Sequence, residues 1–131
     1  MDELPIRSGD DVVRVRQQVR SAAAACGLSL IDQTKLVTAA SELARNALIH
    51  GGGGQALVEQ MVSGTGRKGI RVVFTDSGPG IPDLDLALTD GWTSGDGLGL
   101  GLSGARRVVD EFELTSAPGA GTSVAVSKWS R

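Results

Sequence analysis

Glycine is the residue that most constrains this chain, because it occurs 19 times in 131 residues, about twice its usual share. The glycines gather at residues 51–54, 78–80, 91–104 and 119–121. The segments between these clusters have regular hydrophobic spacing, which is typical of helices and strands. We therefore expect the glycine-rich stretches to be ligand-binding loops on a regular scaffold and not flexible linkers.

Hydrophobic spacing in the first part of the chain predicts two helices. After Ser8, apolar residues recur at alternating intervals of three and four, and Gly27 is expected to end this helix. Ser29 and Asp32 then form a capping-box pattern, so a second helix should begin there and run to about His50. We expect its buried face to consist of Leu36, Ala40, Leu43 and Ala47.

The remainder of the chain reads mainly as strands that can pair as hairpins. The expected elements are strands at residues 4–7, 55–62, 69–75, 112–116 and 122–129, a short helix at 84–88 and a longer helix at 102–111. This order predicts a single domain, residues 1–131, of the α/β (α+β) class. Its architecture would be a two-layer sandwich of a mixed β-sheet and about three helices.

Composition narrows the functional classes. The net charge is −2 and no basic stripe stands out, so we expect no nucleic-acid partner. No apolar run is long enough to cross a membrane, and the N-terminus lacks the pattern of a signal peptide. Cys26 is the only cysteine, which excludes an internal disulfide, and we expect it in the core. These features predict a cytoplasmic protein.

The first of three polar clusters lies on the second predicted helix. Glu42 and Asn46 are four residues apart, so they share one helical face beside the buried stripe. A carboxylate there could accept a proton, and an amide oxygen is a suitable ligand for Mg²⁺. Taken alone, the pair has a more ordinary interpretation as solvated polar residues on an amphipathic helix.

The second cluster, DSGPG at residues 76–80, directly follows a predicted strand. Asp76 could accept a hydrogen bond from an exocyclic amine such as that of adenine. Gly78 and Gly80 would let the backbone approach a flat ring, because they have no Cβ atoms. The same five residues also fit an ordinary tight turn.

The third cluster alternates glycine and leucine ahead of a predicted helix. Glycines at alternate positions free backbone N–H groups to face one anion, and a helix N-terminus adds a favourable dipole. The segment lacks the lysine of a Walker motif and does not follow a strand as a Rossmann fingerprint does. A plain flexible loop is the alternative. The cluster comprises Gly97, Leu98, Gly99, Leu100 and Gly101.

The order of the clusters is similar to that in the GHKL (Bergerat-fold) superfamily of ATPases and kinases. The pattern Glu-x-x-x-Asn, then Asp-x-Gly-x-Gly, then Gly-x-Gly-Leu-Gly-Leu before a helix resembles its N, G1 and G2 boxes. The resemblance spans residues 41–126 and includes a glycine–threonine pair at 121–122. Within the superfamily, the stretches SELARN at 41–46, DSGPGIPD at 76–83 and DEF at 110–112 resemble switch serine kinases of the RsbT type.

The resemblance implies roles for the site residues. Asn46 would hold Mg²⁺, and Glu42 would act as the general base. Asp76 would bind the adenine amino group of ATP, supported by Thr122. The glycine-rich residues would form the base pocket, at Gly78 and Gly80, and the phosphate loop, at Gly97, Leu98, Gly99, Leu100 and Gly101.

The same resemblance implies a serine/threonine-protein kinase that uses MgATP. Its substrate would be a serine on a STAS-domain scaffold or antagonist protein, in a bacterial stress or sigma-factor pathway that works by partner switching. Phosphorylation would free the kinase to activate a PP2C-type phosphatase, and a homodimer is compatible with the sequence. Two alternatives stay open: an RsbW-type anti-sigma factor kinase that binds a sigma factor, and a non-catalytic, ATP-gated protein-binding module.

The chain also departs from many members of the superfamily. Ile49 stands where they carry a lysine, and residues 80–95 contain no lysine or arginine. No cation for the transferred phosphate is therefore evident, and Arg45 and Arg106 are the available candidates. His50, the only histidine, is expected to be structural, because no upstream dimerisation helix would present it for phosphorylation.

Overall fold

The computed structural model describes residues 2–78, 102–116, 119 and 121–131. The predicted short helix at 84–88 and the predicted phosphate loop lie outside the described residues. Within them, no helix is both long and apolar enough to cross a membrane.

The described helices are α1 (Gly9–Ala25), α2 (Leu30–Ile49) and α4 (Leu102–Val108). The predicted N-cap of α2 is confirmed, because the Ser29 hydroxyl accepts a hydrogen bond from the Asp32 backbone N–H at 3.1 Å. Ser8 is the N-cap of α1, at the position where the sequence predicted that this helix begins. Gly27 follows α1 with φ of +90°, a conformation that favours glycine. The prediction that the last helix reaches residue 111 is wrong, because Glu111 already pairs with β5.

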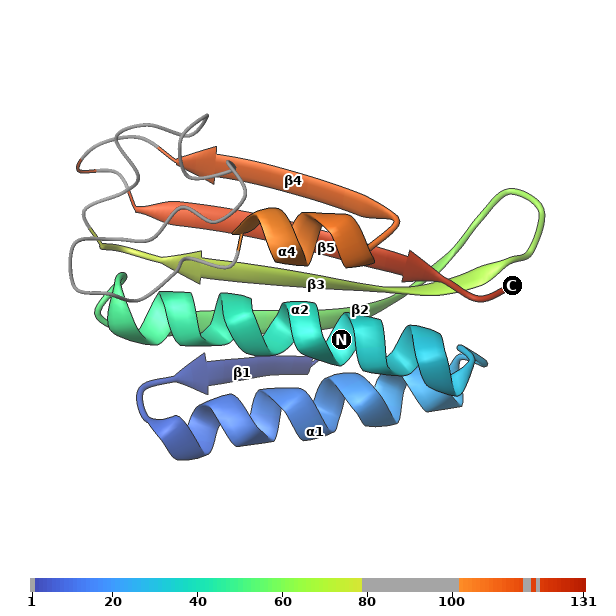
Figure 1. Cartoon of the computed structure of the whole chain (residues 1–131), viewed down its shortest axis with the longest axis horizontal. Coiled ribbons are helices and arrows are strands. Elements are labelled where there is room, and N and C mark those ends of the chain that lie inside the picture. Colours follow the sequence, from blue (N-terminus) through green and yellow to red (C-terminus); the bar gives the residue numbers. More distant parts are fainter. Residues whose placement is uncertain (1, 79–101, 117–118, 120) are drawn as a thin grey trace.

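The strands are β1 (Asp2–Ile6), β2 (Gly54–Val62), β3 (Lys68–Asp76), β4 (Glu111–Ser116) and β5 (Thr122–Trp129). They form one sheet in the order β1-β2-β3-β5-β4, and all the pairings between these described strands are antiparallel. The expected mixed sheet is therefore corrected. Figure 1 shows the reason for the first pair: α1 and α2 follow β1 in the chain and run in opposite directions, so β2 enters the sheet from the end at which β1 left it.

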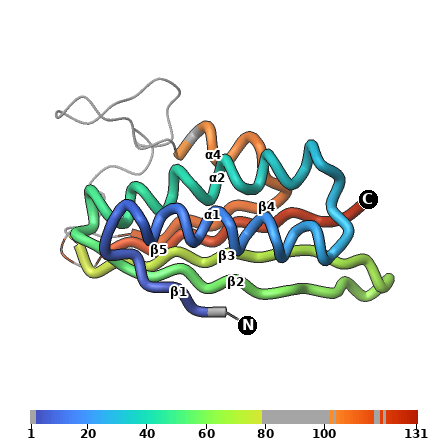
Figure 2. The backbone as a smooth tube through the Cα atoms, turned by 90° about the horizontal axis from the view of Figure 1, so that it is seen from below, coloured from blue at the N-terminus to red at the C-terminus, as the bar shows by residue number. Residues whose placement is uncertain are grey.

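The two predicted layers are confirmed, with α1, α2 and α4 packed on one face of the sheet (Figure 2). All the residues expected on the buried face of α2 are buried, and Cys26 is a buried free thiol in the same core. Burial raises the pKa of that thiol, which keeps it protonated at neutral pH. The largest fully buried side chains are Ile6, Val15, Val19, Leu36, Leu43, Ile70, Val72 and Val126.

A group of paired charges, here called the C-terminal charge cluster, fastens the end of β5 to the start of α2. Lys128 is only 3% exposed, and its Nζ lies 3.6 Å from Asp32 Oδ1 and 3.4 Å from Asp110 Oδ1. Arg131 Nε donates to Asp32 Oδ2 at 3.1 Å. The cluster therefore joins three segments that are distant in sequence.

Candidate nucleotide-binding site

The last turns of α2, the end of β3 and the start of β5 meet at one edge of the fold. Antiparallel pairing sets Thr122 directly opposite Asp76, and Gly54 of β2 faces Asp76 from the other side. Together these elements enclose a cavity of about 460 Å³, counting space open to solvent. The lining residues are Leu43, Asn46, Ala47, His50, Gly51, Phe74, Asp76, Leu102, Thr122 and Val124.

Three of the predicted site residues therefore lie together. Asn46, Asp76 and Thr122 come from three different elements and line the same cavity. The remaining lining is mostly apolar, so polar groups are few and convergent, as in small-molecule sites generally. Leu102, at the start of α4, contributes a buried side chain next to the predicted phosphate loop in the sequence.

The Asp76 side chain is held by glycine backbone. Its Oδ1 accepts a hydrogen bond from the Gly78 N–H at 2.9 Å. A Cβ atom on Gly51 would stand 2.4 Å from Asp76 Cγ, and one on Gly121 would stand 2.2 Å from the Asp76 carbonyl oxygen. Neither distance is sterically tolerable, so glycine at these two positions is needed for Asp76 to occupy its place.

Gly78 has a reason of its own to be glycine. A Cβ atom there would lie 2.6 Å from Gly51 Cα. The sequence predicted that Gly78 makes room for a flat ring; the structure adds that it makes room for Gly51. Gly80 lies outside the described residues.

Thr122 is tied to its neighbouring strand. Its Oγ1 lies 2.9 Å from Ser116 Oγ, and the Ser116 hydroxyl also donates to the Gly121 carbonyl oxygen at 2.9 Å. Ser116 thus fixes the turn that carries Thr122 opposite Asp76. In this arrangement the Thr122 hydroxyl is oriented by Ser116.

Glu42 lies elsewhere. It sits on α2 four residues before Asn46, about 6 Å along the helix axis, but it lines a different groove, between α1 and α2. Its Oε1 lies 3.2 Å from Arg45 Nη1 in a half-exposed ion pair. The structure thus places the predicted base one helical turn outside the cavity that holds Asn46 and Asp76.

Comparison with known proteins identifies the family. The family model described as "Histidine kinase-, DNA gyrase B-, and HSP90-like ATPase" matches residues 31–130. The chain belongs to this ATPase family. Membership implies that the chain uses ATP.

Individual proteins of similar sequence narrow the comparison. The chain is 44% identical to the "Serine/threonine-protein kinase RsbT" of Bacillus subtilis strain 168 over 121 residues, which cover 92% of this chain and 90% of that protein. It is 29% identical to an "Anti-sigma F factor" of Thermoanaerobacter sp. strain X514 over 120 residues, covering 87% of this chain and 82% of the other.

Solved structures share the fold. The RsbU and RsbW domains of a Mycobacterium tuberculosis protein match all of this chain with a TM-score of 0.65 and 23% identity, and this chain spans 33% of that one. The catalytic domain of the histidine kinase ThkA matches 98% of this chain with a TM-score of 0.54 and 16% identity, and 95% of that domain is covered. At these identities the likeness concerns the fold alone.

The cavity residues suit the ligand of the ATPase family. An adenine ring is flat and largely apolar, which matches the Phe74 and Val124 side of the cavity, while its amino group could donate to the Asp76 carboxylate. The Asn46 amide oxygen is a hard, neutral ligand of the kind that Mg²⁺ accepts beside phosphate oxygens and water. The donor set therefore fits a magnesium-bound nucleotide.

Two residues that shape the cavity were not predicted from the sequence. Gly51 packs against Asp76, and Ser116 orients Thr122. The run of glycines at residues 51–54, just after the helix that carries Asn46, was the available signal for Gly51. Ser116 gave no signal, because its role depends on the pairing of β4 with β5.

Proposed function

We propose that this chain is a cytoplasmic protein serine kinase that transfers the γ-phosphoryl group of ATP to a serine of a STAS-domain protein, in a bacterial partner-switching pathway. The observation that carries the proposal is the convergence of Asn46, Asp76 and Thr122 on one cavity in a chain of this ATPase family. The relative named as a serine/threonine-protein kinase, similar over nearly the whole length of both chains, supports protein as the phosphoryl acceptor.

Asp76 and the apolar cavity wall would bind and orient the adenine of ATP. Bound Mg²⁺, held by Asn46, would neutralise charge on the phosphates. Asn46 and Glu42 lie one turn apart on α2, which would align the nucleotide with the incoming serine. Fixing both reactants on one rigid helix reduces the entropy cost of reaching the transition state.

Glu42 would serve as the proton acceptor. As the bond between the serine oxygen and the γ-phosphorus forms, the bond from that phosphorus to the bridging oxygen of ADP breaks, and the serine proton moves to the Glu42 carboxylate. Before this step the Glu42–Arg45 pair, 3.2 Å apart, must open or shift. Arg45 would then be free to interact with the transferred phosphate.

The test is transfer of labelled phosphate from MgATP to purified STAS-domain proteins of the same organism. The Glu42→Ala variant should bind ATP as the wild type does and lose transfer by about a hundredfold or more, because a positioned base contributes that much. The Glu3→Ala variant removes an exposed carboxylate on β1 and is the matched control. Full transfer by Glu42→Ala would exclude Glu42 as the base.

A second candidate function is an anti-sigma factor kinase, because relatives carry the name "Anti-sigma F factor". Such a protein would co-purify with a sigma factor, and a kinase that acts only in the switch would not. A non-catalytic, ATP-gated binding module is the third outcome of the same assays. It would form a nucleotide-dependent complex with its partner and leave the partner serine unlabelled.

A further inference from the structure

We infer that the groove between α1 and α2 is the docking site of the protein substrate, and that it receives an acidic segment next to the phosphoacceptor serine. The inference rests on the proposed function, because it supplies the substrate for that reaction. The groove encloses about 470 Å³, counting space open to solvent. Its lining residues are Arg16, Arg20, Thr34, Val37, Thr38, Ser41 and Glu42.

The position of Glu42 is the first reason. Glu42 lines this groove and not the cavity of Asn46 and Asp76. A serine that delivers its proton to Glu42 must therefore approach along the helical surface, from the α1 side. Asn46 is only one turn further along α2, so a hydroxyl at this end of the groove would stand between the base and the nucleotide.

Charge is the second reason. Arg16 and Arg20 lie four residues apart on α1, and among the described residues neither has an ion-pair partner. Their neighbours are engaged differently: Arg14 pairs with Asp11, and Arg45 pairs with Glu42. Two like charges at this spacing repel each other on an isolated helix, so carboxylates from a partner would relieve a repulsion that the fold leaves in place.

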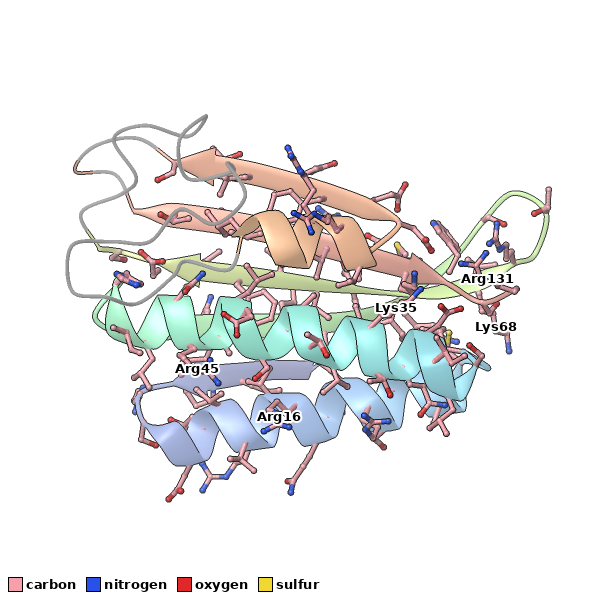
Figure 3. All side chains as sticks on the ribbon, viewed as in Figure 1. Arg16, Lys35, Arg45, Lys68 and Arg131 are labelled. Atoms are coloured by element: carbon pink, nitrogen blue, oxygen red, sulfur yellow. The ribbon has the colours of Figure 1, made fainter. Side chains whose placement is uncertain are left out.

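The location of the positive charges is the third reason. Figure 3 shows Arg16 and Arg45 along the α1–α2 side, whereas Lys35, Lys68 and Arg131 lie towards the other end of the molecule. Thr38 and Ser41 add hydroxyl groups to the α2 wall of the groove. The groove therefore offers guanidinium and hydroxyl donors leading to a single carboxylate, which suits an acidic, serine-bearing segment.

The first test measures the KM for the STAS-domain protein that accepts phosphate from the wild type. The Arg16→Glu/Arg20→Glu double variant should raise this KM by about tenfold or more. The rise in KM should be larger in low salt than in high salt, because salt screens the charges. Its ATP affinity should stay unchanged. The Arg16→Gln/Arg20→Gln variant should give a smaller rise, which separates loss of attraction from new repulsion.

The matched control is the Lys35→Glu/Lys68→Glu variant, which changes the net charge equally at exposed positions outside the groove. An equal rise in KM in this control and in the arginine double variant would overturn the inference, as would an unchanged KM in the arginine variant. Circular dichroism of each variant checks that α1 remains folded.

A second assay separates failure of the inference from failure of the proposed function. Fluorescent peptides with a central serine flanked by glutamates or by lysines are titrated with wild-type protein and followed by anisotropy. The glutamate peptide should bind more tightly, and Arg16→Glu/Arg20→Glu should remove the difference. If no STAS protein accepts phosphate, the proposed function fails, and the peptides alone decide the groove: equal binding of both overturns it.

Discussion

The two ends of α2 are built in contrasting ways. At the first end, Asp32 is 3% exposed and lies in the C-terminal charge cluster with Lys128, Asp110 and Arg131. At the last end, Asn46 borders a cavity. There the backbone of Gly51, which has no side chain, packs directly against Asp76. Figure 1 shows these ends at opposite sides of the molecule.

The contrast shows that the first end of α2 is fixed by packed side chains, whereas the last end leaves space for a ligand. Buried paired charges fix segments in one arrangement but tolerate little change, because removing one partner leaves the others unpaired. Glycine lets the backbone approach closely without filling the adjoining space. We therefore expect changes at the first end to alter stability without altering ATP binding, and changes at the last end to do the reverse.

The largest expected effect is that of Lys128→Met. It leaves Asp32 and Asp110 without their shared cation, so the free energy of unfolding should fall by about 3 kcal/mol. Urea denaturation measures this, and calorimetry should find the ATP affinity unchanged. Lys35→Met, at an exposed position on α2, the helix that carries Asp32, should leave the free energy of unfolding within about 0.5 kcal/mol of the wild-type value. A similar loss in both variants would contradict the contrast.

The next effect concerns Asp76→Asn at the other end. Replacing the carboxylate weakens a hydrogen bond to the adenine amino group by about 2 kcal/mol, which is roughly thirtyfold in Kd for ATP. The stability of the nucleotide-free protein should change little, because the bond from the Gly78 N–H to Oδ1 can persist. An unchanged Kd would remove Asp76 from the adenine site.

A smaller effect is expected for Gly51→Ala. The new methyl group would collide with Asp76 Cγ and displace the carboxylate, so ATP affinity should fall by about tenfold. In Asp76→Asn the same methyl should cost much less, because the two residues act on one interaction. Gly64→Ala, where an added Cβ meets nothing within 4 Å, is the matched control. Additive losses in the double variant would show that Gly51 acts independently of Asp76.

The smallest expected effect is a pH dependence of the stability that Asp32 contributes at the first end of α2. Burial alone would raise the pKa of Asp32, but the hydrogen bond from Arg131 and the charge of Lys128 outweigh it and hold the pKa below the ordinary value of 3.8. The stabilisation is therefore fully present above pH 3.8 and is lost as the pH falls through the lower pKa of the folded state. The difference in unfolding free energy between wild type and Asp32→Asn should shrink in acid; a constant difference would contradict this.

Local signals in the sequence predicted most elements correctly. Ser8 and Ser29 cap helices because a cap depends on a hydroxyl and the next turn of backbone. The strand predicted at residues 122–129 has those same bounds in the structure, because the glycine-containing turn before it and its strand-forming residues are local signals. The antiparallel sheet and the early end of α4 were missed, because both depend on how segments pack against each other.

The sequence by itself thus predicted the candidate site residues, through the types and order of Glu42, Asn46, Asp76 and the glycines. Only the tertiary structure decided which residues lie next to one another. Strand register put Thr122 opposite Asp76, close packing put Gly51 against it, and the meeting of α1 with α2 turned Glu42 towards another groove. The physical reason is that residue chemistry is fixed by the chain locally, whereas proximity between distant segments is fixed by the core that joins them.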